Sequence, residues 1–370
     1  MNILLVSSSS WAGMGPYASE IINLFLGDTN VYYFLIEDER RFFSKNISEG
    51  MRNRGIILYK ENSGFNKLLA LFFPPYSIEK ALKQFCIDHN IDVIHFLTSE
   101  VPYCRTILQL SKQYKVFFTV HDLHPHEAKK VFYKQFRHTM MYRKLAQIRS
   151  GVNNLITNSK SQEVELKEMF PEKKVYYHEF PSLINSSIIE GRMIPKELNG
   201  AEDYILFFGR IEQYKGVDMA YEAFSEDSTL RRQTLVIAGS GDLYFPIDNQ
   251  KNPNIIIINR YIKDEEVAYL FNHARLTLYP YISATQSGVL SVSSYFGKPI
   301  IASNVPFFMS VEQNGLGCNF ICCDKQDMIA KIKSMMSIDT TPISRREKEY
   351  YQSNFSKQSL RKSLLEIYSR

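Results

Sequence analysis

Short runs of β-branched and aromatic residues alternate along the chain with segments whose apolar residues recur at helical spacing. In the first half these runs predict strands at 2–6, 30–36, 55–59, 92–97, 115–120 and 154–158. Helical periodicity lies between some of them, at 78–90 and 101–114. Because strands separated by helices of this length form βαβ units, the pattern predicts a parallel sheet.

A second alternating series follows a weakly periodic stretch. Residues 182–203 are rich in Ser, Asn, Gly and Pro, which is typical of a connection. Apolar runs then predict strands at 204–209, 234–239, 254–259, 275–280 and 299–303, and residues 342–369 contain two helix-like segments. We therefore expect an α/β protein of two doubly wound parallel-sheet domains, with ligands at the carboxyl ends of the strands in a cleft between them.

The domain boundaries are placed where the pattern changes. The first domain is expected over 1–183, a linker over 184–203 and the second domain over 204–345. Residues 346–370 are expected to form C-terminal helices that cross back to the first domain. A chain of 370 residues is too long for one ordinary hydrophobic core, which agrees with two domains.

Composition narrows the class of protein. Hydrophobic residues make up 45% of the chain and charged residues 22%, which indicates a globular protein and excludes a disordered one. There is no apolar run of 18 residues, and the first residues lack the basic start of a secretory signal. The five cysteines show no CxxC or zinc spacing, so we expect reduced thiols and a cytoplasmic location. A net charge of +5 permits attraction to anionic lipids or phosphate-bearing substrates.

The segment YILFFGRIEQYKGVDMA, residues 204–220, joins a buried strand to a helix through two basic residues. The strand ends at Gly209, Arg210 follows it, and Lys215 with Gly216 opens the next helix. Arginine offers a planar fork for two phosphate oxygens, and lysine adds a mobile charge beside the helix N-terminus. The combination suits a diphosphate. The alternative is two exposed basic residues at the edge of a sheet.

The segment YPYISATQSGVLSVSSYFGKP, residues 279–299, brings small hydroxyl residues and a glycine to the head of a helix and contains no acid. Backbone N–H groups there can hold a phosphate without a carboxylate nearby. The alternative is an uncharged helix cap. A second glycine-containing turn, Gly13-Met14-Gly15, follows the first strand and permits close backbone approach to a ligand, although it lacks the full dinucleotide fingerprint.

Two further segments concentrate basic or titratable residues. HDLHPHE, residues 121–127, holds three of the eight histidines, but Pro125 separates two of them and no ligand partner has supporting spacing, so no metal is expected. Residues 129–149 contain seven Lys or Arg and no acid, with apolar residues at partly helical spacing. That composition suits a helix whose basic face meets lipid phosphates or an anionic acceptor, or a plain solvated face. No recognised motif supports nucleic acid as the partner.

Six segments resemble the family 4 retaining glycosyltransferases, which have the GT-B fold. They follow one another along the chain in the order that is typical of that family. Gly-Arg, four residues and Lys-Gly resembles their donor-diphosphate motif. The others are LLVSSSSWAGMGPYASEI, FFTVHDLHPHE, LITNSKSQEVEL, LVIAGSGD with INRYIKDEEVAYLF, and the segment 279–299. The family pattern places two glutamates, separated by seven residues, in that last segment. This chain has Ala284 and Val292 at the matching positions.

The resemblance implies transfer of a sugar from a nucleotide-diphosphate sugar, UDP first and GDP second, to a hydroxyl acceptor with retention of configuration. Arg210 and Lys215 would stabilise the leaving diphosphate, and His121 would lie at the donor sugar and the acceptor. No metal or other cofactor is implied, and the chain has no DxD motif. With no carboxylate in the matching positions, a front-face route is implied. The donor-binding positions would be Gly13, Gly15, Gly209, Gly239, Gly241, Arg260, Tyr261, Ile262, Gln286, Ser287, Gly288 and Val289.

The expected acceptor is a lipid-linked or anionic saccharide, in cell-surface polysaccharide or lipopolysaccharide assembly at the inner face of the plasma membrane. Residues expected on that acceptor or membrane side are Glu127, Lys129, Lys130, Lys134 and Arg137. Two alternatives remain open. One is a non-catalytic GT-B scaffold that supports an active transferase, which the missing glutamates favour. The other is a nucleotide-sugar epimerase, which the acid-free segment 279–299 disfavours because that chemistry needs acid–base pairs.

Overall fold

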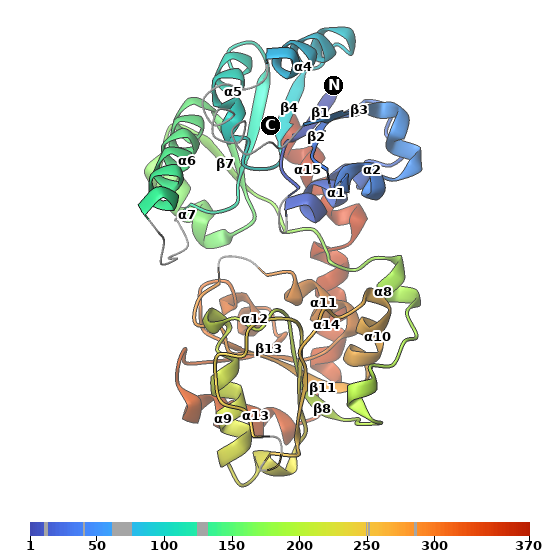
Figure 1. The fold of residues 1–370 in the computed structure, drawn as a ribbon, viewed down its shortest axis with the longest axis vertical. Coiled ribbons are helices and arrows are strands. Elements are labelled where there is room, and N and C mark those ends of the chain that lie inside the picture. Colours follow the sequence, from blue (N-terminus) through green and yellow to red (C-terminus); the bar gives the residue numbers. More distant parts are fainter. Residues whose placement is uncertain are drawn as a thin grey trace. The chain divides into compact units, whose positions relative to one another are not determined.

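The computed structural model describes residues 1–10, 14–39, 41–60, 76–123, 132–248, 250, 252–284 and 287–370, with no side chains for 132–138. The chain divides into two compact units (Figure 1). Unit 1 comprises Met1–Pro181 with Leu360–Arg370, and unit 2 comprises Ser182–Ser359. Each unit is built around a single parallel sheet.

Unit 1 has a seven-stranded parallel sheet in the order β3-β2-β1-β4-β5-β6-β7. The strands are β1 (Ile3–Ser7), β2 (Val31–Glu37), β3 (Gly55–Tyr59), β4 (Val93–Phe96), β5 (Lys115–Val120), β6 (Asn154–Thr157) and β7 (Lys174–Tyr177). The helices of this unit's first 181 residues are α1 (Met14–Asn23), α2 (Phe42–Asn46), α4 (Tyr76–Asp88), α5 (Cys104–Leu110), α6 (Phe132–Gly151) and α7 (Lys160–Met169), with 3-10 turns at Glu49–Arg54 and Val101–Tyr103.

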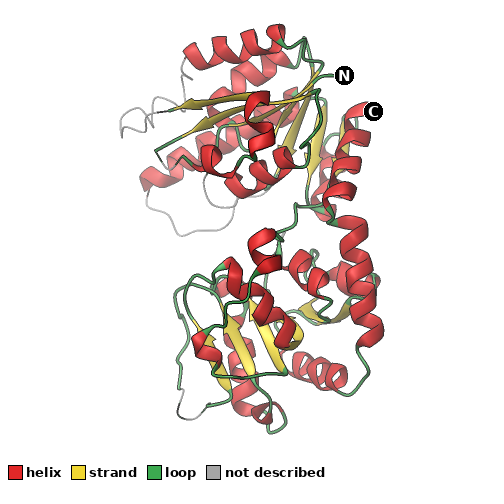
Figure 2. Cartoon of the chain, turned by 90° about the vertical axis from the view of Figure 1, so that its right-hand side faces the viewer, coloured by secondary structure: helices red, strands yellow, loops and turns green. Residues whose placement is uncertain are grey.

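Both faces of the first sheet are buried, which explains why its strands are continuously apolar. Successive residues of β1 point into different cores: Leu4 and Val6 belong to one hydrophobic cluster, and Ile3 and Leu5 to the other. Helices lie on both faces of the sheet (Figure 2). A strand covered on both sides shows no polar alternation, as the sequence pattern predicted.

Unit 2 has a six-stranded parallel sheet in the order β10-β9-β8-β11-β12-β13. Its strands are β8 (Tyr204–Phe208), β9 (Leu235–Ala238), β10 (Ile255–Ile258), β11 (Ala274–Tyr279), β12 (Ile300–Ser303) and β13 (Gly317–Phe320). Its helices are α8 (Ser186–Glu190), α9 (Val217–Glu226), α10 (Asp264–His273), α11 (Val289–Phe296), α12 (Met309–Gln313), α13 (Lys325–Met336) and α14 (Thr341–Asn354), with 3-10 turns at Lys196–Leu198, Gln213–Lys215 and Leu230–Arg232. The last helix, α15 (Lys357–Ser369), enters unit 1 at Leu360.

Every strand predicted from the sequence is present, and the parallel α/β class is confirmed. Two strands were not predicted, β7 and β13, which are edge strands of their sheets. β13 reads GCNF and contains a single large apolar residue, Phe320, so its own sequence gives a weak strand signal. It pairs in parallel with β12, which reads IIAS and is fully buried.

The segment expected as a linker, 184–203, contains α8 and the turn Lys196–Leu198 and lies within unit 2. The Asn185 side chain caps α8 by accepting from the N–H of Ile188, and its amide donates to Asp264 at the start of α10. At the other end of the chain α14 packs against α11. The final residues join unit 1, where Arg361 pairs with Asp28.

The order of the strands fixes where ligands are expected. In each sheet the chain moves outward from one central strand and then starts again on its other side, so the switch points lie between β1 and β4 and between β8 and β11. Ligands of such sheets bind beyond the carboxyl ends of the strands at the switch point. In unit 2 these ends carry Gly209 and Pro280, and both expected donor segments begin there.

Candidate functional site

Glycines bring the chain segments after β8 and β9 into close contact. The N–H of Gly209 donates to the carbonyl of Ala238 at 3.0 Å, and the N–H of Ile211 donates to the carbonyl of Ser240 at 2.9 Å. A Cβ on Gly239 would lie 2.0 Å from the Gly209 carbonyl oxygen. A Cβ on Gly241 would lie equally close, 2.0 Å, to the carbonyl oxygen of Ile211. The glycines of this edge are therefore required by the backbone contact itself.

Arg210 and Lys215 leave the end of β8 in different environments. The Arg210 side chain is 68% exposed and pairs with Glu212 at 2.7 Å. Lys215 is buried, and its ammonium nitrogen lies 5.1 Å from the centre of the Tyr281 ring. Gly216 follows in the left-handed conformation, with φ +61°, and starts α9. A side chain there would meet the carbonyl oxygen of Pro280, so the turn carrying Lys215 packs directly on the end of β11.

The buried position of Lys215 changes its acidity. Burial, with a smaller contribution from the Arg210 charge, lowers the pKa of Lys215 from 10.5 to about 8, and Glu212 opposes the shift. The lysine is therefore still a cation at neutral pH, but one that lacks a carboxylate within ion-pairing distance among the described residues. An anionic ligand placed beside it would restore that missing interaction.

The segment after β11 reaches the same point. Three groups surround the position that a Cβ on Gly209 would occupy. They are the Lys215 ammonium at 2.8 Å, the Tyr281 hydroxyl at 3.6 Å and the Val289 side chain at 3.9 Å. Val289 is the first residue of α11, after Ser287 and Gly288. The structure thus brings Gly209, Lys215, Val289 and the start of α11 together, although they come from two separate segments of the sequence.

A pocket of about 440 Å³ opens at this edge of unit 2. It is lined by Arg210, Ile211, Glu212, Gln213, Ser240, Gly241, Asp242 and Tyr244. The Tyr244 hydroxyl donates to Asp218 in α9 at 2.9 Å, which fixes one wall. Sequence reasoning did not single out Glu212 or Tyr244, because nothing in their local pattern distinguishes them from ordinary loop residues.

Three expected donor residues lie apart from this pocket. The Arg260 guanidinium donates to both carboxylate oxygens of Glu266, at 2.7 Å each, and to Glu197 at 2.7 and 3.0 Å. Tyr261 is 73% exposed and Ile262 is buried. None of the three lines the 440 Å³ pocket. The hydrogen-bonding capacity of Arg260 is taken up within the protein.

His121 follows β5 in unit 1 and is buried. Its Nε2 lies 2.8 Å from the carbonyl oxygen of Leu97, to which it donates, and the ring packs edge-on to Tyr17 with 4.7 Å between centres. Burial lowers the pKa of His121, which favours the neutral ring with Nδ1 as acceptor. That Nδ1 atom has no hydrogen-bond partner in the described part of the chain. The Gln162 amide also clamps this loop, donating to the His121 carbonyl oxygen and accepting from the N–H of Leu123.

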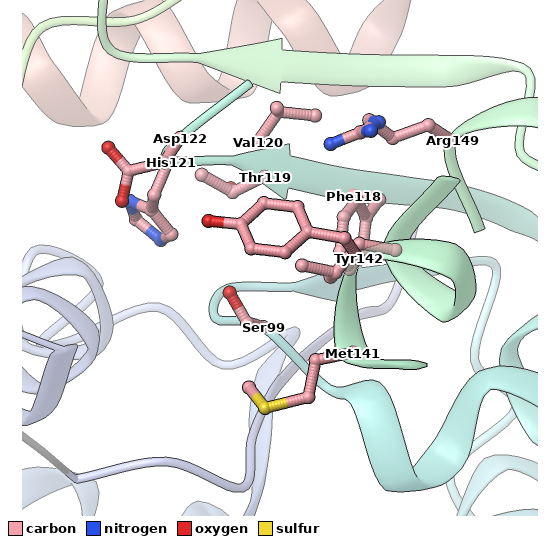
Figure 3. A pocket seen from close by; sticks show the side chains of 10 residues that line it. Ser99, Phe118, Thr119, Val120, His121, Asp122, Met141, Tyr142 and Arg149 are labelled. Carbon is pink, nitrogen blue, oxygen red and sulfur yellow. The ribbon is translucent and has the colours of Figure 1, made fainter. Parts of the chain in front are cut away.

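A second, smaller pocket of about 130 Å³ adjoins His121 (Figure 3). Its polar lining consists of Ser99, Thr119, His121, Asp122, Tyr142 and Arg149. Sequence reasoning counted Arg149 only as one member of the basic run 129–149. It did not single out Ser99 or Tyr142, because their meeting depends on the packing of α6 against α5 and the turn Val101–Tyr103.

The loop after β1 is organised by a buried acid. Glu100 accepts hydrogen bonds from the backbone N–H and the hydroxyl of both Ser8 and Thr98. Further along, Gly15 lies in α1, where a Cβ would come within 2.9 Å of the Phe42 ring. This glycine therefore allows α1 to pack against α2. Several expected residues lie outside the described part of the chain: Gly13, Glu127, Lys129, Lys130 and Gln286, together with the side chains of Lys134 and Arg137.

Residues 192–353 match the model of the family described as "Glycosyl transferases group 1". The match is to this segment, which is less than half of the chain. It covers most of unit 2 and contains both Lys215 and the segment 279–299. No curated protein sequence matches the chain.

Solved structures show that the whole chain has the GT-B fold. Sucrose-phosphate synthase from Thermosynechococcus elongatus has a TM-score of 0.69 at 14% identity, covering 100% of this chain and 98% of its own. Anabaena HepE in complex with UDP-glucose has a TM-score of 0.68 at 14% identity, covering 100% and 99%. A UDP-forming trehalose-phosphate synthase from Burkholderia vietnamiensis has a TM-score of 0.65 at 11% identity, with full coverage of both chains.

The described helices include none that is long and apolar enough to cross a membrane. The described residues also contain no group of three or more His, Cys, Asp or Glu side chains placed to hold a metal ion.

Proposed function

We propose that the protein is a retaining glycosyltransferase that moves a sugar from a nucleotide-diphosphate sugar to a hydroxyl acceptor. The observation that carries this proposal is the position of Lys215. Lys215 is a buried cation with no carboxylate at ion-pairing distance among the described residues. Its place at the carboxyl end of a central strand, beside Arg210 and the start of α11, suits a diphosphate. The family match covers this same segment.

In this mechanism the bond between the anomeric carbon and the leaving phosphate oxygen breaks as negative charge builds on the diphosphate. Arg210 and Lys215 stabilise that charge, and because both are already in place the protein needs little reorganisation. The acceptor oxygen attacks the same face of the sugar, and its proton passes to the leaving phosphate oxygen. Configuration is thereby retained without a protein nucleophile, and no step requires a metal. His121 orients the sugar or the acceptor.

The donor is proposed to be a UDP-sugar, with a GDP-sugar second. The support for UDP is that Anabaena HepE was crystallised with UDP and with UDP-glucose, and that the similar Burkholderia enzyme is a UDP-forming synthase. Ser287, Gly288 and Val289 precede or begin α11 and are proposed to face the donor, together with the chain after β8. The acceptor is proposed to be a lipid-linked or anionic saccharide in cell-surface polysaccharide or lipopolysaccharide assembly, at the inner face of the membrane.

Turnover without an acceptor tests this function. Purified protein is incubated with a panel of UDP- and GDP-hexoses, and release of the nucleotide diphosphate and the anomer of the sugar product are followed. Slow release from one donor with retained configuration is expected, abolished in Lys215→Met and unchanged in Lys196→Met, which alters an exposed lysine of the same unit. Binding of a donor with no turnover, with or without candidate acceptors, would favour the non-catalytic scaffold. A trapped covalent glycosyl-enzyme would contradict the front-face route.

A further inference from the structure

A buried arginine in unit 1 has no counter-ion among the residues that the structure describes. Arg149 lies in the last turn of α6 and is only 8% exposed. Its Nε has no hydrogen-bond partner, and no salt bridge joins it to any residue of the described chain. Buried guanidinium groups are ordinarily paired, because removing the charge from water costs several kcal/mol. An unpaired Arg149 therefore needs an explanation.

Arg149 lines the 130 Å³ pocket next to His121. Figure 3 shows its guanidinium pointing from the end of α6 toward Val120, while the Tyr142 ring reaches across toward His121 and Asp122. With about 30 Å³ for each water of liquid volume, the pocket has room for about four waters, or for one compact polar group. The opening is therefore large enough for a phosphoryl or carboxylate group.

The other end of the pocket has a different character. Asp122 lies across from Arg149 in Figure 3, beside the His121 ring. The Nδ1 atom of His121, which has no hydrogen-bond partner in the described part of the chain, can accept a hydrogen bond from a hydroxyl group. The Asp122 carboxylate beside it consists of acceptor oxygens, which also suit hydroxyl groups. Ser99 and Thr119 add hydroxyls to the lining. The pocket thus offers a cation at one end and acceptors at the other.

We propose that this pocket binds an acidic sugar, with its phosphoryl or carboxylate group on Arg149 and its hydroxyls toward Asp122 and His121. The planar guanidinium can bind two oxygens of such a group, which a lysine would not do with the same geometry. That the sugar is part of the acceptor rests on the proposed function. The anion site itself rests only on the burial and missing partner of Arg149 and on the pocket.

The alternative is that Arg149 is only a cation at a helix C-terminus, where it would interact favourably with the helix dipole. The two explanations predict opposite changes in stability when Arg149 is replaced. If Arg149 serves the helix, replacing it with methionine should destabilise the protein. If it serves a ligand, the same change removes a buried charge whose desolvation no partner offsets in the ligand-free protein. That protein should then be at least as stable as before.

The test is titration of the full chain with inorganic phosphate, glucose 6-phosphate, glucuronate and glucose at constant ionic strength, by calorimetry, together with thermal unfolding. Wild type is compared with Arg149→Met and with the matched control Arg143→Met, an exposed arginine on the same helix. We expect saturable binding of at least one acidic sugar and not of glucose. Binding should weaken at least tenfold in Arg149→Met and stay unchanged in Arg143→Met, with no loss of stability in either variant.

The absence of saturable binding by wild type, or equal binding by wild type and Arg149→Met, would overturn the proposal. If Arg149→Met does not fold, Arg149→Lys decides, since a lysine keeps the charge but loses the fork: binding should fall several-fold, and unchanged binding overturns the site. Binding of glucose 6-phosphate but not glucuronate would identify a phosphoryl site, and the reverse a carboxylate site. Binding of inorganic phosphate with neither acidic sugar would overturn the proposal of a sugar site. UDP is titrated in parallel. If UDP binds but no acidic sugar does, only the proposed anion site at Arg149 is wrong. If an acidic sugar binds but UDP does not, only the proposed glycosyltransferase function is wrong.

Discussion

The ammonium of Lys215 lies where a side chain at Gly209 would be. A Cβ on Gly209 would come within 2.8 Å of Nζ, and the backbone of Gly209 has φ +142°, a conformation that favours glycine. The missing side chain lets a buried cation reach the end of β8, beside the point where Arg210 leaves the strand. The glycine before the arginine in the Gly-Arg motif thus has a physical role of its own.

The first prediction concerns that contact. Gly209→Ala should displace the Lys215 ammonium and weaken nucleotide-diphosphate binding tenfold or more, which is about 1.4 kcal/mol. Gly200→Ala is the matched control, because Gly200 also has a positive φ, +82°, but has no atom within 4 Å of its Cβ position. Calorimetric titration of both variants checks this. Equal affinities in the two variants would show that the Gly209–Lys215 contact does not matter for binding.

The second prediction concerns stability. With its pKa lowered from 10.5 to about 8, Lys215 is protonated below pH 8 in both the folded and the unfolded chain, so the full cost of burying the cation is present at pH 7. Lys215→Met should raise the free energy of unfolding at pH 7 by on the order of 1–3 kcal/mol, while it weakens nucleotide binding.

Because the folded lysine loses its proton first, that cost is relieved as the pH rises from about 8 to 10.5. The gain in Lys215→Met should therefore shrink over the same interval. Urea unfolding of wild type, Lys215→Met and Lys196→Met at several pH values measures it. A loss of stability in Lys215→Met at pH 7 would show that the lysine makes a favourable contact that outweighs its burial.

The third prediction is the pH dependence of donor binding. A diphosphate beside Lys215 stabilises the protonated form, so affinity should be constant below pH 8 and should fall as the pH rises through the lysine pKa of about 8. UDP-glucose is the suitable ligand, since its diphosphate keeps its charge over this interval. Titrations from pH 7 to 9.5 should show the fall in wild type. A fall of the same size in Lys215→Met would assign it to another group.

The fourth prediction separates Arg260 from the donor site. Arg260→Met leaves Glu266, which is only 3% exposed, without its cation, and should lower the free energy of unfolding by on the order of 1–3 kcal/mol. Because its guanidinium is already taken up by Glu266 and Glu197, nucleotide affinity should stay within about twofold of wild type. Arg231→Met, at an exposed position, is the control. A tenfold loss of affinity would return Arg260 to the donor-binding residues.

The fold class and most of the strands could be predicted because most strands are recognisable from their own residues. A strand buried on both faces is apolar throughout, and β8 and β11 are recognisable from five or six residues each. The meeting of Gly209 with Lys215 could also be anticipated, because both lie within one motif. β13 could not, because its four residues carry little strand propensity and its pairing is decided by β12.

Long-range contacts explain what the sequence did not reveal about the site. Arg260 pairs with Glu266, six residues on, but also with Glu197, 63 residues away in the chain, and this second contact has no local signature. The burial of Arg149 has the same origin. Within the basic run 129–149 it looks like its neighbours, and only the packing of α6 beside His121 removes it from solvent.

The measurement that tests the central claim most directly is calorimetric titration of the protein with UDP, GDP and their hexose conjugates, repeated on Arg210→Ala and Lys215→Met, with Lys196→Met as control. The account predicts that one nucleotide class binds in the micromolar range and that either substitution at the end of β8 weakens it tenfold or more, while the control does not. Absence of binding by every ligand, or binding that neither substitution affects, would contradict a diphosphate site at Arg210 and Lys215.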